Sequence, residues 1–151
     1  MKIVVLDSGP LGRISNPRLT PINRECWQWS RTLAEAGCRV IVPEIADYEV
    51  RRELIRAGAT TGIERLDVVK FSLEYLPLTT EAMLRAAELW AEVRRRGLPT
   101  ASPYALDADA ILAAQALVVA AEAGDLAVVA TDNAGHLGWF VEARSWREIG
   151  P

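Results

Sequence analysis

The sequence predicts an α/β fold in which helices cover both faces of a parallel sheet, and two observations point to it. Three short runs are almost wholly apolar and rich in β-branched residues, namely Ile3–Leu6, Arg39–Val42 and Ala127–Ala130. Runs without polar alternation are typical of parallel strands that are buried on both faces. Longer stretches with helical character lie between them, and this alternation is typical of α/β layers. At 151 residues, the chain is expected to form one domain over residues 1–151.

Four stretches are predicted to be helices, and each of them ends just before a glycine. They cover about residues 22–36, 43–57, 80–96 and 107–123, and the glycines are Gly37, Gly58, Gly97 and Gly124. Glycine at this position adopts the left-handed conformation that commonly ends a helix. Three consecutive arginines at 94–96 support the third helix, because cations are favourable at the negative end of a helix dipole.

Two segments have weaker patterns. Residues 60–76 are expected to hold a short helix from about Ile63 and a brief strand near Tyr75. The segment Ser8–Thr20 is expected to be a loop, because it contains two glycines and two prolines within ten residues, namely Gly9, Pro10, Gly12 and Pro17.

Charge and cysteine content exclude several classes of protein. With 17 basic and 20 acidic residues the formal net charge is −3, so the chain is not a nucleic-acid binder that relies on excess basic charge. This charge leaves a metal-dependent nuclease open, because divalent ions can supply the positive charge that phosphate requires. Cys26 and Cys38 lack CxxC spacing and are expected to lie far apart along the first helix, which disfavours a disulfide.

Targeting and membrane signals are also weak. The apolar residues 1–6 are too few for the core of a signal peptide, and Asp7 follows them directly. The longest apolar run, at about residues 110–121, is interrupted by Gln115 and is shorter than the roughly 20 residues of a membrane span. We therefore expect a soluble, cytoplasmic protein without a membrane partner.

Four acidic residues are predicted to meet at one edge of the sheet. Asp7 and Asp132 directly follow two of the strands, Glu49 lies in the helix after the second strand, and Asp109 lies in the first turn of the last helix. The carboxyl ends of parallel strands share one edge, where ligands bind. Because like charges repel, such a cluster needs a cation or a raised pKa. Carboxylate oxygens are suitable ligands for Mg²⁺ or Mn²⁺.

Each acid also has a structural interpretation. Asp7 and Asp132 could be ordinary turn residues. Asp107 and Asp109 could cap the last helix or stabilise its first turn, and capping is the better interpretation of Asp107. Glu49 could belong to a solvated helix face. The metal-site hypothesis therefore depends on the joint placement of the acids.

These residues also form a pattern that resembles the PIN domain, a family that includes VapC-type toxins and stand-alone relatives. The pattern covers nearly the whole chain and consists of Val-Leu-Asp7-Ser8, Pro43-Glu44-Ile45, the run from Tyr48 to Leu54, Asp109-Ala-Ile-Leu-Ala-Ala, and Thr131-Asp132-Asn133. The resemblance implies a three-layer α/β/α sandwich around a mostly parallel sheet. It also implies Mg²⁺- or Mn²⁺-dependent cleavage of RNA, with Asp7, Glu49, Asp109 and Asp132 as the catalytic, metal-binding acids.

The resemblance implies partners as well, and the sequence departs from the commoner toxin pattern in one place. The implied partners are an RNA substrate, an antitoxin protein and a second copy of the chain. Asp7 is followed by Ser8-Gly9-Pro10 instead of Thr-Asn, and the next segment is longer and contains proline. In this respect the chain looks more like a stand-alone PIN protein than a typical toxin.

Several other residues are candidates for supporting roles. Ser8 and Thr131 could hydrogen-bond a carboxylate or a metal-bound water, and the hydroxyls could equally satisfy nearby backbone. Arg52 lies beside Glu49 on one predicted helix and could face phosphate. Asp107 and Asn133 lie close in sequence to Asp109 and Asp132 and are the remaining candidates for supporting roles.

For three further side chains, a structural or solvated role is the simpler interpretation. Arg13 and Arg18 could meet RNA phosphates from the predicted loop, although solvated surface cations are the simpler interpretation. His136, the only histidine, is expected to be a structural hydrogen-bonding residue and not a base.

The main alternative function is a PIN-fold module that binds RNA or protein with little turnover. Other acid-rich or triad enzymes fit less well. A phosphotransfer receiver requires a lysine after a late strand, but lysine occurs only at Lys2 and Lys70. An Asp-x-Asp phosphatase requires a second aspartate where Gly9 stands, and the Gly-x-Ser-x-Gly turn of a serine hydrolase is absent.

Overall fold

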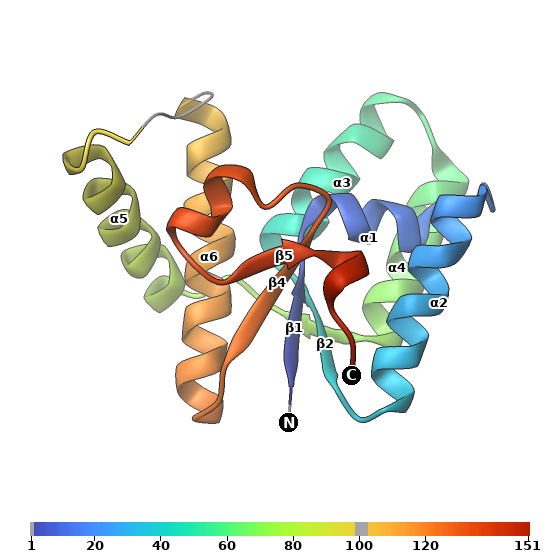
Figure 1. Cartoon of the computed structure of the whole chain (residues 1–151). Helices are drawn as coiled ribbons and strands as arrows, with labels where there is room; N and C mark the ends of the chain where they lie inside the picture. Colours follow the sequence, from blue (N-terminus) through green and yellow to red (C-terminus); the bar gives the residue numbers. More distant parts are fainter. Residues whose placement is uncertain (1, 99–102) are drawn as a thin grey trace.

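A computed structural model describes residues 2–98 and 103–151, and its centre is a five-stranded sheet (Figure 1). The strands are β1 (Ile3–Leu6), β2 (Arg39–Pro43), β3 (Glu74–Leu76), β4 (Ala127–Thr131) and β5 (Ala143–Ser145). They lie in the order β3-β2-β1-β4-β5, and all four pairings are parallel. The three apolar runs in the sequence are therefore the three central strands, as predicted.

Helices flank this sheet on both sides. They are α1 (Ser8–Ser15), α2 (Pro21–Glu35), α3 (Glu44–Arg56), α4 (Thr60–Ser72), α5 (Thr80–Arg95) and α6 (Pro103–Ala123), with short 3₁₀ turns η1 (Gly135–Trp139) and η2 (Trp146–Glu148). Four of them, α2, α3, α5 and α6, confirm the helices expected from sequence to within a few residues. The glycines behind α2 and α6 have positive φ angles of 88° and 64°, in agreement with their predicted role in ending a helix.

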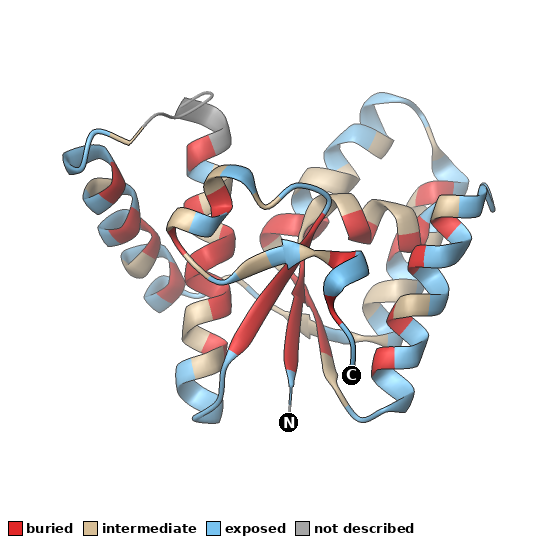
Figure 2. Cartoon of the chain, viewed as in Figure 1, coloured by how far each residue is buried: buried red, intermediate tan, exposed pale blue. Residues whose placement is uncertain are grey.

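The layers follow from the alternation of side chains along the strands. On β1, Ile3 and Val5 belong to the core shared with α5 and α6, whereas Val4 and Leu6 belong to the core shared with α1, α2 and α4. Figure 1 shows these two groups of helices on opposite sides of the strands, and Figure 2 shows that the central strands are buried. The fold is therefore the three-layer α/β/α sandwich that the PIN-domain resemblance implied.

The prediction of a loop at Ser8–Thr20 is correct only for residues 16–20, because α1 occupies Ser8–Ser15. The carboxylate of Asp7 accepts a hydrogen bond from the backbone N–H of Ser8 and so caps the helix. Pro10 lies in the first turn, where its missing N–H has no hydrogen bond to lose. A cap and a tolerated proline thus allow a helix where the local composition favours a loop.

The last helix begins four residues earlier than predicted, so the expectation that Asp107 caps it and that Asp109 lies in its first turn is wrong. The helix α6 begins at Pro103, so Asp109 lies beyond its first turn and neither Asp107 nor Asp109 is a first-turn acid. Stabilisation of the helix dipole therefore does not account for Asp109. Two smaller differences are that α4 begins at Thr60, earlier than expected, and that β5 had no recognised sequence signal.

The buried side chain of Gln115 connects α6 to α3 and β3. Gln115 of α6 is 1% exposed, accepts a hydrogen bond from the backbone of Ile45 at 3.3 Å and donates one to the carbonyl of Leu76 at 3.0 Å. It thereby fixes the start of α3 and the end of β3 against α6. Cys26 and Cys38 are free thiols, and none of the described helices is both long and apolar enough to cross a membrane.

Candidate active site

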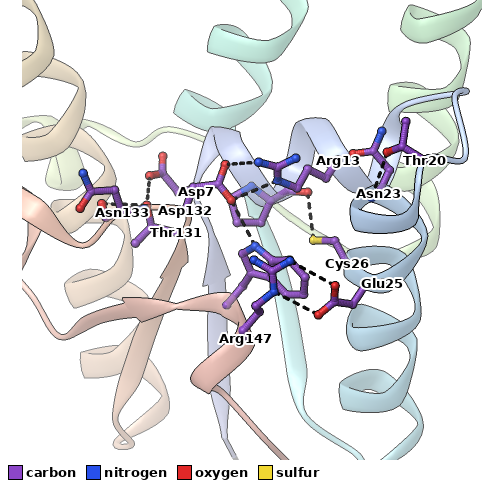
Figure 3. Close-up of polar contacts among 12 residues, drawn as sticks. Asp7, Arg13, Thr20, Asn23, Glu25, Cys26, Thr131, Asp132, Asn133 and Arg147 are labelled. Carbon is purple, nitrogen blue, oxygen red and sulfur yellow. Dashed lines mark hydrogen bonds and ion pairs between the residues drawn. The ribbon is translucent and has the colours of Figure 1, made fainter.

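Asp7 lies at the carboxyl end of β1 and is held by two hydrogen bonds. Its Oδ1 accepts from the Ser8 backbone at 2.7 Å, and its Oδ2 accepts from the Thr131 hydroxyl at 2.8 Å. Figure 3 shows the contact between Asp7 and Thr131, which joins the ends of β1 and β4. The Thr131 hydroxyl in turn accepts from the backbone N–H of Asn133 at 3.3 Å. Three predicted supporting residues, Ser8, Thr131 and Asn133, thus order the Asp7 carboxylate and the turn behind it.

Glu49 and Asp109 reach the same end of the sheet from α3 and α6. Burial, which is the largest cause, and the charges of Asp7 and Asp109 together raise the pKa of Glu49 to about 7, against a lowering effect from Arg52. Burial and the charge of Asp7 likewise raise the pKa of Asp109 to about 6, against a smaller lowering effect from His136. These mutual effects show that Asp7, Glu49 and Asp109 form one electrostatic group.

The chemistry of these three carboxylates suits a divalent cation. Three acids that are partly removed from water cannot all ionise without cost unless positive charge lies among them. Their ligand atoms are all oxygen, the type that Mg²⁺ and Mn²⁺ prefer. Within residues 2–98 and 103–151, however, no three His, Cys, Asp or Glu side chains converge closely enough to hold one ion. A bound ion would therefore have to draw the carboxylates nearer to one another.

The remaining predicted residues lie around this group in different ways. Arg52 is half exposed, with its Nη2 3.8 Å from Glu49 Oε2 and its guanidinium 5.1 Å from the centre of the Tyr48 ring. Asp107 is exposed on α6, two residues before Asp109. Arg52 is consequently the predicted cation that adjoins the acids.

Asp132, the fourth predicted acid, faces a different set of partners. Its two oxygens accept from Nε and Nη2 of Arg13 at 3.1 and 3.2 Å (Figure 3). The indole Nε1 of Trp146 donates to Oδ1 at 3.1 Å. Arg13 was expected to be a solvated or phosphate-facing loop residue, but it lies on α1 and its guanidinium binds Asp132.

Sequence reasoning missed the role of Arg13 and did not single out Trp146. The glycines and prolines of residues 8–20 favour a loop, so local composition gives no sign that Arg13 lies on a helix. Recognition of Asp7 as a helix cap would have put Arg13 near the end of α1. His136 stacks on Trp139, with 4.5 Å between ring centres, and lies close enough to Asp109 to lower its pKa.

A groove begins beside these acids and runs between α1, α3 and the start of α4. Its volume is about 950 Å³, and Ser8 and Glu49 line it together with three arginines, namely Arg13, Arg18 and Arg52. The carboxyl groups of Glu49 and Glu53 and several arginines thus share one open surface, a combination suited to a metal ion and a phosphate-bearing chain.

Comparison with solved structures identifies the fold. A chain of VapBC2 from Rickettsia felis, bound to a promoter DNA fragment, matches with a TM-score of 0.73 and 17% identity over 95% of this chain and 98% of that one. FitAcB from Neisseria gonorrhoeae matches at 0.66 and 19%, over 97% and 99%. VapC20 from Mycobacterium tuberculosis, a toxin that cleaves the sarcin-ricin loop, matches at 0.58 and 12%, over 92% and 97%.

This chain has a VapC-like PIN-domain fold. No protein-family model matches the sequence, and no curated protein matches it either. At identities below 25%, the structural likeness establishes the PIN-domain fold and nothing about individual residues. Any statement on the function of this chain therefore rests on the geometry of its acidic site and groove.

Proposed function

We propose that this chain is a metal-dependent endoribonuclease that hydrolyses phosphodiester bonds and acts as a VapC-type toxin. One observation carries the proposal: Asp7, Glu49 and Asp109 come from three different elements and form one partly buried electrostatic group. A purely structural protein gains nothing from this arrangement, because burial and repulsion both make the ionised acids costly. A PIN-domain fold with this group at the carboxyl edge of its sheet supports a nuclease.

Asp7, Glu49 and Asp109 would hold the metal, which would be Mg²⁺ or Mn²⁺. When bound, such an ion lowers the pKa of a water molecule and stabilises charge on the reacting phosphate. The Ser8 backbone and the Thr131 hydroxyl orient the two oxygens of Asp7 and so fix one side of the site. Glu49, with a pKa near 7, exchanges its proton within the neutral range.

The arginine-lined groove supports RNA as the substrate. Arg52 lies next to Glu49, where its half-exposed guanidinium could pair with a phosphate oxygen adjoining the cleaved bond. Arg18 lies farther along the same groove. Such contacts position the strand without reading its bases, so they leave the preferred sequence open.

VapBC2 and FitAcB are named as toxin–antitoxin complexes. Their structural likeness to the present chain supports an antitoxin partner for it. We expect that partner to cover the acidic edge, with an arginine that reaches the carboxylates. Such a pair would act in the cytoplasm. A small protein should copurify from the native host, whereas a free, harmless and fully active enzyme would contradict the toxin role.

One observation favours the alternative, a PIN-fold module that binds RNA or protein with little turnover. Among the residues that the structure describes, no set of three potential ligands is already closed around an ion position. A module of this kind would retain the arginine-lined groove but would not need a metal to bind its partner.

The two functions differ in a cleavage assay on end-labelled single-stranded RNA. The ribonuclease predicts cutting in the presence of Mn²⁺ or Mg²⁺ and its loss when EDTA is added. Glu88→Gln serves as a preparation control, because Glu88 is an exposed acid on α5 and the substitution should leave cutting unchanged. RNA binding without cutting in any of these ions would favour the binding module instead.

A further inference from the structure

Asp132 follows β4, yet hydrogen bonds to α1 and η2 engage both of its oxygens. Arg13 of α1 forms a two-pronged ion pair with the carboxylate, and the indole of Trp146 donates a third hydrogen bond. Figure 3 shows the Asp132 carboxylate directed toward Arg13, whereas Asp7 lies toward Thr131. The two-pronged geometry is specific for this orientation of the carboxylate, although solvent weakens the pair because the Arg13 and Asp132 side chains are 30% and 39% exposed.

The backbone of α1 is shaped to admit this carboxylate. A Cβ atom on Gly9 would lie 2.5 Å from Asp132 Oδ2 and 2.8 Å from its Cγ, closer than real Cβ atoms approach other groups. Glycine at this position therefore lets Asp132 pack directly against the first turn of α1. The close approach and the Arg13 pair are independent features that hold Asp132 in the same place.

The electrostatic effects of Asp132 also indicate that its carboxylate faces α2 and not the other acids. Asp132 raises the pKa of the Cys26 thiol on α2, in addition to the larger effect of burial, which together bring that pKa to about 12. Asp7, in contrast, is the aspartate that raises the pKa of both Glu49 and Asp109. Asp132 thus acts toward α2, and Asp7 acts toward the other acids.

We propose that Arg13 is a positioning residue that withholds Asp132 from the divalent cation and leaves the cation to Asp7, Glu49 and Asp109. This inference rests on the proposed metal-dependent function. Asp132 then ties α1 to the end of β4, the two elements whose Ser8 and Thr131 orient Asp7. To become a metal ligand, Asp132 would have to give up its bonds to Arg13 and Trp146.

The test is Mn²⁺ binding to the full chain without RNA, measured by the paramagnetic resonance signal of free Mn²⁺. Asp132→Asn should keep the Kd of Mn²⁺ within about threefold of the wild-type value, because the asparagine oxygen can still accept from Arg13 and Trp146 and no metal ligand is removed. Arg13→Gln, which releases the Asp132 carboxylate, should tighten binding at least about threefold. In the double variant this tightening should disappear, because the coupling runs through Asp132.

Three other results would contradict the inference, and each would identify a different cause. If Asp132→Asn weakens Mn²⁺ binding about tenfold or more, Asp132 is a ligand and the proposed nuclease function still stands. If Arg13→Gln tightens binding equally with and without Asp132, the effect is one of overall charge. If the wild-type chain binds no Mn²⁺, the proposed metal-dependent function is wrong, and the inference about Arg13 and Asp132 is wrong as well.

The indole of Trp146 provides a second readout that does not depend on affinity. Its N–H resonance in a ¹⁵N spectrum can be assigned by its loss in Trp146→Phe. Because the indole donates to Asp132, the resonance should stay in place when the wild-type chain is saturated with Mg²⁺. A large shift on Mg²⁺ binding, reproduced by Asp132→Asn without the ion, would mean that Asp132 leaves Arg13 for the metal.

Discussion

The Asp7→Asn variant is expected to lose at least about 100-fold in RNA cleavage and at least about tenfold in Mn²⁺ affinity. Asp7 is the acid whose charge reaches both Glu49 and Asp109, so its removal takes the central negative charge out of the metal site. Calorimetric titration with Mn²⁺ and the rate of cutting of end-labelled RNA measure the two losses separately.

Asparagine is a clean probe at this position because it preserves both hydrogen bonds. Its side-chain oxygen can accept from the Ser8 backbone, and its amide can donate to the Thr131 hydroxyl, which can donate to the Asn133 carbonyl at 3.2 Å. The matched control is Asp67→Asn on α4, where the side chain is 59% exposed. Equal Mn²⁺ affinity in wild type and Asp7→Asn would contradict the assignment of Asp7 as a ligand.

The Glu49→Gln variant is expected to be more stable than the wild type at pH 8 without metal, by up to about 3 kcal/mol. In the folded chain the pKa of Glu49 is about 7, above its ordinary value of 4.5, because burial and the charge of Asp7 disfavour ionisation. The folded state therefore holds this proton more tightly than the unfolded state. Its stabilising effect is complete below about pH 4.5 and is lost as the pH rises through 7.

Urea unfolding in EDTA at pH 4.5 and pH 8 measures this effect. The advantage of Glu49→Gln over the wild type should grow with pH, whereas Glu53→Gln, an exposed acid on the same helix, should show little change. Added Mg²⁺ should stabilise the wild type at pH 8, because the cation favours the ionised carboxylates. The same stability difference at both pH values would mean that Glu49 ionises without cost and is not part of a buried acidic group.

The sheet and most helices could be predicted because their signals are local. The central strands are apolar on both faces, and glycines follow the predicted helices, so each element is defined by its own residues. The helix α1 could not be predicted in this way. Its glycines and proline disfavour a helix locally, and it forms because Asp7 caps it and Leu11 and Ile14 are buried against the sheet.

The acidic site was predictable in part for the same reason. Asp7 follows a clear strand, and Glu49 and Asp109 lie on predicted helices, so topology alone brought them toward one edge. Asp132 has an equally clear position after β4, but its partners depend on the helical placement of Arg13 and on Trp146 near the end of the chain. Sequence spacing cannot reveal which way the Asp132 side chain turns, because its main partner, Arg13, lies 119 residues away in the sequence.

The central claim is that three carboxylates hold the metal with which the chain cleaves RNA. Its most direct test is to measure bound Mn²⁺ and the initial rate of RNA cleavage on the same samples across a range of Mn²⁺ concentrations. We predict that the rate rises in proportion to the occupied site and that both signals fall together as the pH drops below 7, where Glu49 and then Asp109 take up protons. Cleavage that persists in EDTA, or full Mn²⁺ occupancy with no cleavage, would contradict the account.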